Sequence, residues 1–163
     1  MPHSENNALI RKFYAAFAAL DGQTMQACYA PFASFEDPVF TLQGREAIGG
    51  MWRMLCDTTR SKGLDAWKLE ASAISAEASI GRAHWEAHYR FSATGRLVHN
   101  IIDAEFGFKD ALIVSHHDRF DFWRWSRQAL GPAGLLLGWT PMLQGKVRRT
   151  AAANLKAFMH KAG

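Results

Sequence analysis

The sequence predicts an α+β domain in which N-terminal helices pack on one side of a curved antiparallel or mixed sheet, with an extra helical segment at the C-terminus. Apolar residues recur every three or four positions up to about residue 60, which is the helical period. From Trp67 onward the period becomes two, which is typical of strands, and after Phe122 the helical pattern returns. Because helices and strands occupy separate stretches, an α+β architecture is favoured over an alternating one.

Three helices are expected before the main part of the sheet. The first covers residues 6–20 and ends at Asp21-Gly22. A short second helix covers residues 23–30, and a third covers residues 45–60, where Gly49-Gly50 weakens the helix locally. The first helix has an apolar face made of Leu9, Ile10, Phe13, Phe17 and Leu20.

Strands are predicted over residues 67–75, 79–92, 96–109 and 111–122, joined by short turns into an antiparallel meander. The strand over 79–92 alternates most clearly, with charged residues on one face and apolar residues on the other. Its apolar face consists of Ala83, Trp85, Ala87, Tyr89 and Phe91.

The chain returns to helix over residues 123–130, breaks at Gly131-Pro132, and forms a final helix over about 141–159. This tail either caps the open end of the sheet or joins a dimer interface. With 163 residues, the chain fits a single domain with a core over about 6–122 and a C-terminal helical extension over 123–163.

The segment Ser34-Phe35-Glu36-Asp37-Pro38-Val39 predicts a short strand that ends at an acid. Pro38 has no N–H to donate and biases Asp37 toward an extended conformation. Apolar residues surround this acid in the sequence, and apolar surroundings raise the pKa of a carboxyl group, as a general acid or base requires. The alternative is an ordinary strand cap facing solvent, since Asp before Pro is common in turns.

Two further strands carry polar residues. The strand over 96–109 places Asp103 between apolar neighbours, where a carboxylate is costly unless it is paired or protonated. The last strand places His116, Asp118 and Phe120 on one face. If such a face lines a cavity, several titratable groups meet there; the alternative is a sheet face turned to solvent or to a second subunit.

Composition and residue spacing argue against several classes of function, namely nucleic-acid binding, metal binding, cofactor binding and membrane insertion. The formal net charge of +4 comes partly from the last helix and is too dispersed for a nucleic-acid site. Adjacent His116, His117 and Asp118 point alternately to opposite faces, so no metal site is expected, and no phosphate-binding loop predicts a cofactor. Neither cysteine has metal-ligand spacing, the N-terminal residues do not show the charged-then-apolar pattern of a leader, and no apolar run reaches membrane-spanning length. We therefore expect a cytoplasmic protein with no membrane partner.

Two segments resemble the nuclear-transport-factor-2-like superfamily, the cone fold of ketosteroid isomerases and SnoaL-type polyketide cyclases. Phe35-Glu36-Asp37-Pro38-Val39 is similar to the isomerase segment that carries the general base, and Ile102-Asp103-Ala104-Glu105-Phe106 to the strand whose protonated Asp donates to an oxyanion. The resemblance covers about residues 6–122. It implies Asp37 as base and Asp103 as oxyanion donor. The end of the last strand is similar to SnoaL-like proteins and implies Asp118 as an alternative base, with Asp121 second.

One position departs from that pattern. The family's oxyanion tyrosine on the first helix aligns with Phe13, and the neighbouring Tyr14 is turned by about 100° around the helix axis. Either the helix is rotated so that Tyr14 serves, or the position has no donor.

These patterns lead to a functional hypothesis: cofactor-independent isomerisation, cyclisation or a lyase step on a small hydrophobic carbonyl compound. Asp37 would remove a proton next to the carbonyl, Asp103 would stabilise the enolate, and His99 or His116 would assist. The pocket would be lined by Trp52, Trp85, Tyr89 and Phe120. A non-catalytic ligand-binding or dimerisation module is the alternative, and epoxide opening by activated water is a third. The resemblance also implies a homodimer formed through the sheet.

Overall fold

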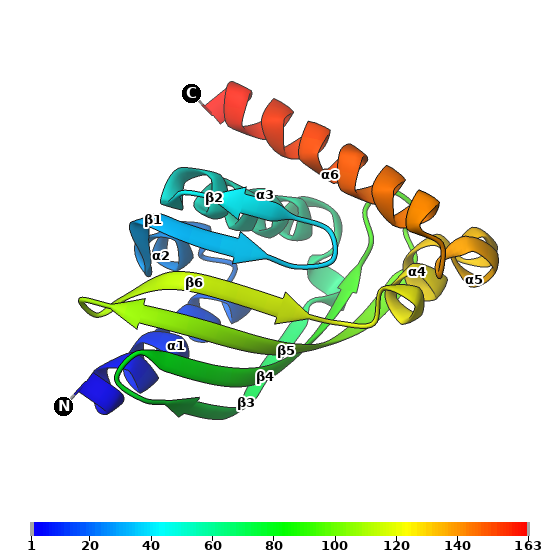
Figure 1. Ribbon diagram of the computed structural model, residues 1–163. Helices are drawn as coiled ribbons and strands as arrows, with labels where there is room; N and C mark the ends of the chain where they lie inside the picture. Colours follow the sequence, from blue (N-terminus) through cyan, green and yellow to red (C-terminus); the bar gives the residue numbers. More distant parts are fainter. Residues whose placement is uncertain (1, 163) are drawn as a thin grey trace.

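The computed structural model describes residues 2–162 and shows helices on one face of a strongly curved sheet, with a long C-terminal helix crossing the top (Figure 1). The helices are α1 (Pro2–Ala18), α2 (Gly22–Ala27), α3 (Arg45–Lys62), α4 (Phe122–Leu130), α5 (Pro132–Leu137) and α6 (Pro141–Ala162), with a 3-10 turn at Leu64–Ala66. The strands are β1 (Tyr29–Glu36), β2 (Thr41–Gln43), β3 (Lys68–Ala76), β4 (Ile80–Arg90), β5 (Leu97–Lys109) and β6 (Leu112–Arg119).

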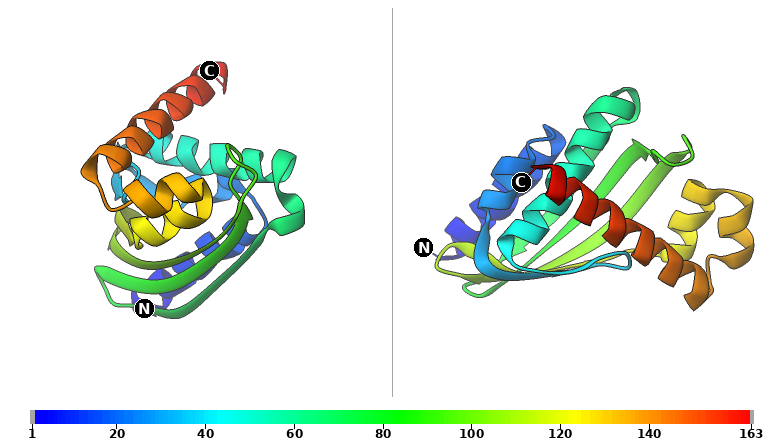
Figure 2. Two further views of the ribbon diagram at one scale, coloured as in Figure 1. Left: turned by 90° about the vertical axis from the view of Figure 1, so that its right-hand side faces the viewer. Right: turned by 90° about the horizontal axis from the view of Figure 1, so that it is seen from above.

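The sheet is mixed, with the strand order β2-β1-β6-β5-β4-β3. All neighbouring strands are antiparallel except β1 and β6, which are parallel and pair Phe35 with His116 and Glu36 with His117. Figure 2 shows the sheet curving around the N-terminal helices. The parallel pair joins the β1–β2 hairpin to the last strand of the meander, so the six strands form one open sheet with β2 and β3 at its edges.

The core lies between the concave face of the sheet and helices α1 and α3. Helix α1 packs on β3 and β4, and α3 packs on β1. The amide of Asn6, buried at the start of α1, donates to the carbonyl oxygens of Glu77 and Ala78 at 2.9 and 3.1 Å, which ties the helix to the β3–β4 turn. Burying the aromatic side chains of this face supplies most of the driving force for folding. The largest are Phe13, Tyr14, Phe17, Tyr29, Phe35, Trp52, Trp85, Phe106 and Phe108.

The C-terminal helices cap the fold rather than extending away from it. Asp121 accepts the backbone N–H of Arg124 and so begins α4, which packs on β5. Helix α6 crosses α3 where Gly50 leaves room for Met159; a Cβ on this glycine would lie 3.0 Å from the Met159 Cγ and Sδ atoms. The tail therefore packs on the body of its own chain, at α3 and β5, and its place in a dimer interface stays a prediction.

The predicted elements agree with the structure to within a few residues at most ends, and the predicted α+β class with helices, curved sheet and C-terminal helical extension is confirmed. Strand β2 was not predicted. It contains three residues, too few for an alternation to be visible. Cys28 and Cys56 are free and buried, as expected for small apolar side chains. No helix among residues 2–162 is both long and apolar enough to cross a membrane.

Candidate functional site

Asp37 stands in the turn between β1 and β2, where its side chain organises the local backbone. Its Oδ1 atom accepts the backbone N–H groups of Val39 and Phe40 at 2.7 and 2.6 Å, and its own N–H donates to the carbonyl oxygen of Phe40. Pro38 lies inside this turn, and because it has no backbone N–H, it leaves no hydrogen-bond donor unpaired there. The Oδ2 atom takes part in no hydrogen bond with the part of the chain that the structure describes, so it is free to meet a ligand.

Burial raises the pKa of Asp37 from its ordinary value of 3.8 to about 7, because a carboxylate loses its hydration there. The two backbone N–H groups lower it, the negative charge of Asp118 raises it, and the positive charge of Arg148 lowers it. The Arg148 guanidinium reaches the turn from α6 and donates to the carbonyl oxygens of Asp37 and Pro38 at 3.3 and 3.1 Å. A carboxyl group that titrates near neutrality is suited to proton transfer.

Asp118 enters the same region through the parallel strand pair. Glu36 pairs with His117, so Asp37 and Asp118 are the next residues along two neighbouring strands. Side chains alternate between the faces of a sheet, and Phe35 and His116, two positions earlier, are both buried on the concave face. Asp37 and Asp118 are therefore expected to share the concave face, and the negative charge of Asp118 raises the pKa of Asp37.

A chain of buried hydrogen bonds holds Asp118. The Trp52 Nε1–H donates to the Tyr29 hydroxyl at 3.0 Å, this hydroxyl lies 2.7 Å from His116 Nδ1, and His116 Nε2 lies 2.8 Å from Asp118 Oδ1. Because the Tyr29 oxygen accepts from Trp52, its own proton is available to His116 Nδ1, and Nε2–H then donates to Asp118. The Trp85 indole N–H also donates to Asp118 Oδ1, at 3.3 Å. These hydrogen bonds offset the cost of burying the Asp118 side chain, which is 2% exposed.

The Tyr14 hydroxyl lies in the same region. Its oxygen is enclosed and has no hydrogen-bond partner in residues 2–162. Burial raises the pKa of Tyr14 well above its usual value, and the charge of Asp118 raises it further, so the hydroxyl keeps its proton at neutral pH. Phe13 is also buried and makes edge contacts with the Tyr14 and Trp52 rings. Both residues of the first helix thus face the core, and Tyr14 supplies a donor near Asp118.

The structure separates Asp103 from the other predicted catalytic residues. In β5 the buried positions are Val98, Asn100, Ile102, Ala104, Phe106 and Phe108, and the alternate positions face outward. The Asp103 side chain is 79% exposed and contacts His84 Nδ1 at 2.9 Å across the outer face. The expectation that Asp103 lies in an apolar chamber with Asp37 is wrong, because a strand residue one position away from a buried one points to the opposite face.

His99 lies on the same outer face, so the expectation that it helps bind a ligand beside Asp37 is also wrong. Its ring stacks on His88 with centroids 4.0 Å apart, and its Nε2 lies 2.7 Å from Glu86 Oε1. The imidazole of His84 contacts Glu86 as well, at 3.2 Å. This polar row belongs to the outer surface of the sheet.

Asn100 is a concave-face residue that sequence reasoning did not select. It is buried, and its side-chain amide makes no hydrogen bond within residues 2–162. It pairs with Ala87, toward the end of the sheet covered by α4. The sequence does contain a signal that could have identified it: Asn100 falls on the same side of the β5 alternation as the apolar residues Val98, Ile102 and Ala104.

The four predicted lining residues all lie on the concave side, but they do not surround an open chamber. Trp52 and Trp85 are buried, and Phe17 lies between them with ring centroids 5.0 and 5.5 Å away. Tyr89 and Phe120 are half-buried at the end of the sheet that α4 covers, where the Tyr89 hydroxyl accepts the Trp125 indole N–H at 2.7 Å. The charge of Asp37 adds to burial in raising the pKa of Tyr89, so these two residues are close neighbours. Aromatic rings thus fill the deep end of the cone, and Tyr89 and Phe120 pack under α4 at its other end.

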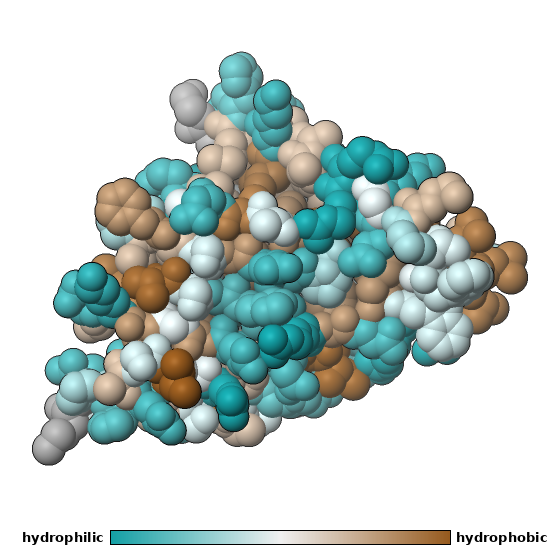
Figure 3. Space-filling model, viewed as in Figure 1, coloured by the Kyte–Doolittle hydropathy of each residue, from teal (hydrophilic) through white to brown (hydrophobic). Residues whose placement is uncertain are grey.

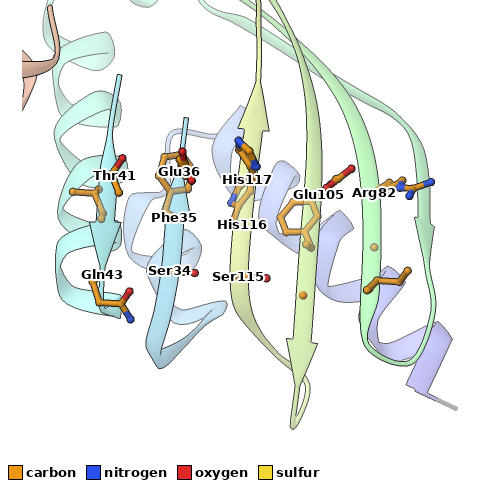
Figure 4. A pocket seen from close by; sticks show the side chains of 15 residues that line it. Ser34, Phe35, Glu36, Thr41, Gln43, Arg82, Glu105, Ser115, His116 and His117 are labelled. Atoms are coloured by element: carbon orange, nitrogen blue, oxygen red, sulfur yellow. The ribbon is translucent and has the colours of Figure 1, made fainter. Parts of the chain in front are cut away.

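One of the hollows that the structure shows lies on the other side of the sheet. It is a groove of about 450 Å³ crossing the outer face, bordered by Glu36, Arg82, Glu105 and His117 (Figure 4). Of the predicted catalytic residues, only His116 borders it. A second hollow of about 480 Å³ lies along α6, beside Leu42, Leu155 and Met159. No group of His, Cys, Asp or Glu side chains within residues 2–162 has the arrangement of a metal site.

Comparison with known proteins adds the family context. Residues 10–116 match the model of a family described as the SnoaL-like domain. No curated protein matches the chain by sequence. Among solved structures, an LEH-like epoxide hydrolase of M. tuberculosis is 16% identical, with a TM-score of 0.65 over 84% of this chain and 98% of that one.

Two further structures have similar scores. A protein with the provisional name polyketide cyclase from Xanthomonas campestris pv. campestris is 17% identical, with a TM-score of 0.62 over 78% of this chain and 98% of that one. A Catenulispora acidiphila protein with a ketosteroid isomerase-like fold, in complex with trimethylamine, is 15% identical, with a TM-score of 0.63 over 82% of this chain and 97% of that one. At these identities the likeness concerns the fold.

Proposed function

Since the chain belongs to the SnoaL-like domain family, with a ketosteroid isomerase-like fold, we propose that it catalyses a cofactor-independent isomerisation, cyclisation or lyase step on a small hydrophobic carbonyl compound. The observation that carries the proposal is Asp37, whose pKa of about 7 and unbonded Oδ2 atom fit a general base.

In the proposed step, Asp37 Oδ2 removes a proton from the carbon next to the carbonyl group. The two backbone N–H groups on Oδ1 fix the direction of the carboxyl group, so little reorganisation precedes proton transfer. The developing enolate oxygen requires a donor, and with Asp103 on the outer face that role passes to Tyr14. Its hydroxyl keeps its proton and has no other partner in residues 2–162.

Asp118 and His116 have a supporting role in this scheme. The charge of Asp118 helps to keep the pKa of Asp37 near neutrality, and His116 holds Asp118 in place. The ligand would reach Asp37 past the half-buried residues Tyr89 and Phe120, at the end of the cone beside α4. Two neighbouring carboxyl groups with different environments can take different protonation states at one pH, which acid–base catalysis uses.

Opening of an epoxide by activated water is a second candidate. The fold match to an LEH-like epoxide hydrolase and the unbonded amide of Asn100 on the concave face favour it, because that amide could hold the attacking water beside a carboxylate. The same acids would serve, with Asp37 or Asp118 as base.

The test is an assay of purified protein on a panel of hydrophobic ketones and a panel of epoxides. Asp37→Asn should lower kcat by about a hundredfold or more on any compound that the parent converts. Asp103→Asn is the matched control, since it removes an acid from the outer face. Unchanged turnover in Asp37→Asn would remove this residue from the mechanism. If the parent binds a compound of either panel without converting it, the chain is a ligand-binding module.

A further inference from the structure

Half of the exposed large apolar side chains in residues 2–162 lie between Trp123 and Met142. Five of them form a continuous group on α5 and the start of α6, here called the apolar tip: Leu135, Leu136, Leu137, Trp139 and Met142. Trp139 is 74% exposed and Met142 is 81% exposed. The tip protrudes at the end of the molecule remote from α1, where apolar residues gather in Figure 3. Single exposed apolar residues are common, but a contiguous group marks an interaction surface.

The tip is a folded element. Gly134 of α5 lies directly against the Ser126 carbonyl of α4, so closely that a Cβ would overlap it. The Trp123 indole N–H donates to the Leu135 carbonyl at 3.2 Å, and the Trp139 indole N–H donates to the Leu136 carbonyl at 3.0 Å. These contacts turn the apolar side chains of α5 outward while its backbone stays fixed on α4. A binding partner would therefore meet a preformed surface.

A row of basic residues begins at the tip and follows α6. Steps of three and four residues place one set of exposed side chains along one side of this helix, here called the basic stripe: Met142, Lys146, Arg149, Ala153, Lys156 and His160. Arg148, Leu155 and Met159 lie on the opposite side, where they contact the body of the protein. The stripe is exposed along a helix about 33 Å long, and Lys156 and His160 at its far end also border the hollow beside Leu42.

The charges of the chain are strongly segregated. Residues 122–163 contain seven Lys or Arg and no Asp or Glu, whereas residues 1–121 contain twelve Lys or Arg and fifteen Asp or Glu. The C-terminal helices are therefore cationic on a body that is slightly anionic. A cationic surface with an apolar end is complementary to one chemistry in particular, an anionic lipid surface, because headgroups attract the basic residues and the interface accepts the apolar ones.

We propose that the apolar tip and the basic stripe bind the surface of an anionic lipid bilayer, with the tip in the interfacial layer and the stripe over the headgroups. The binding would be peripheral, since no helix of residues 2–162 could cross a membrane. A second copy of the chain is a poorer partner, because a symmetric contact through the tips would bring the two cationic stripes together. The proposal replaces the sequence-based expectation that the protein has no membrane partner.

The experiment is co-sedimentation of the full-length protein with vesicles of phosphatidylcholine and phosphatidylglycerol, and with vesicles of phosphatidylcholine alone. We expect binding to the mixed vesicles that is at least about tenfold tighter than to the neutral ones and that weakens with added salt. The tip variant Leu136→Gln/Trp139→Ser and the stripe variant Lys146→Glu/Arg149→Glu should each weaken binding to mixed vesicles by about tenfold or more.

Matched controls change the same residue types elsewhere on the surface. Phe32→Ser removes an apolar side chain that is 87% exposed, and Lys68→Glu reverses an exposed charge; both should bind like the parent. Absence of binding by the parent, or equal losses in the controls, would overturn the proposal. So would a dimer of the parent, detected by light scattering without lipid, that the tip variant abolishes, because the tip would then be an interface between two copies.

Discussion

Asp37 and Asp118 stand next to one another on the concave face because β1 and β6 are parallel and pair Glu36 with His117, one position earlier. The two acids have different surroundings. Asp118 accepts N–H groups from Trp85 and His116, whereas Asp37 accepts only two backbone N–H groups, on one oxygen, and has a pKa of about 7. This relationship determines how the site responds to mutation and to pH.

Removing the charge of Asp118 should lower the pKa of Asp37. The negative charge is one of the causes that raise it, and Asp118→Asn eliminates that charge while keeping an oxygen for Trp85 and His116 to bind. We expect a decrease of about one unit, measured by NMR titration of the Asp37 carboxyl carbon. The control is Asp103→Asn on the outer face, which should leave the Asp37 titration unchanged. A pKa that stays at about 7 in Asp118→Asn would show that the two acids do not interact.

Arg148 should act in the opposite direction. Its charge lowers the pKa of Asp37, and its guanidinium holds the Asp37 and Pro38 carbonyl groups, so Arg148→Met should raise the pKa and loosen the turn. We expect faster hydrogen exchange at the Val39 and Phe40 amides. Arg149→Met, which changes the neighbouring exposed residue on α6, is the control. Equal exchange rates in both variants would show that Arg148 does not stabilise this turn.

The stability of the fold should depend on the charge state of Asp37. Because its pKa is raised from 3.8 to about 7 in the folded state, the folded chain binds a proton that the unfolded chain has lost between these values. Stability is therefore lost as pH rises from about 4 through 7, and Asp37→Asn abolishes this loss.

Relative to the parent, Asp37→Asn should gain stability between pH 5 and pH 8 by about 2.6 kcal/mol, the equivalent of the roughly two pKa units that lie between pH 5 and the folded-state pKa. Urea unfolding of both proteins at the two pH values measures this difference. Two proteins whose free energies of unfolding change in parallel with pH would contradict the raised pKa of Asp37.

His116 should contribute strongly to stability. His116→Ala leaves the Tyr29 hydroxyl and the Asp118 carboxylate without their shared partner in a buried site, which should cost about 3 kcal/mol in the free energy of unfolding. His117→Ala changes the adjacent residue on the outer face and should cost less than about 1 kcal/mol. Urea denaturation of the two variants gives the comparison, and similar losses in both would argue against the buried network.

The variant Tyr14→Phe tests the contribution of the Tyr14 hydroxyl, the candidate oxyanion donor, to stability and to kcat separately. The Tyr14 hydroxyl is enclosed without a partner among the described residues, so removing it should leave stability unchanged or increase it by up to about 1 kcal/mol. On a converted ketone, the same change should lower kcat by about tenfold or more. A loss of stability above 1 kcal/mol would show that the hydroxyl has a structural partner, and unchanged kcat would remove it from the mechanism.

Local patterns in the sequence were sufficient to predict most of the fold. The helical period locates α1 and α3, and alternation assigns Trp85 and Tyr89 to the buried face of β4 and His116 with Asp118 to the buried face of β6. What could not be predicted is the parallel pairing of β1 with β6, because no local signal links two strands so distant in the sequence. The neighbour relation between Asp37 and Asp118 depends on that pairing.

Asp103 shows a second limit of predicting the site from the sequence. Its neighbours Ile102 and Ala104 are buried, but they occupy the opposite face of the strand, so an apolar neighbourhood in sequence did not mean an apolar neighbourhood in space. The outer face also carries the apolar residues Leu97 and Ile101, so in the sequence this face looks as hydrophobic as a buried one. Only the position of the helices decides which face of β5 is covered.

The position of β6 between β1 and β5 also sets an order of events during synthesis. A nascent chain that has not yet emerged beyond Leu112 has an unpaired edge on β1, and its Asp37 lacks the neighbouring strand. Such an edge can pair with another chain, so a stalled or truncated product would be prone to aggregate. The juxtaposition of Asp37 and Asp118 would then form late, when the final strand is released by the ribosome and docks between β1 and β5.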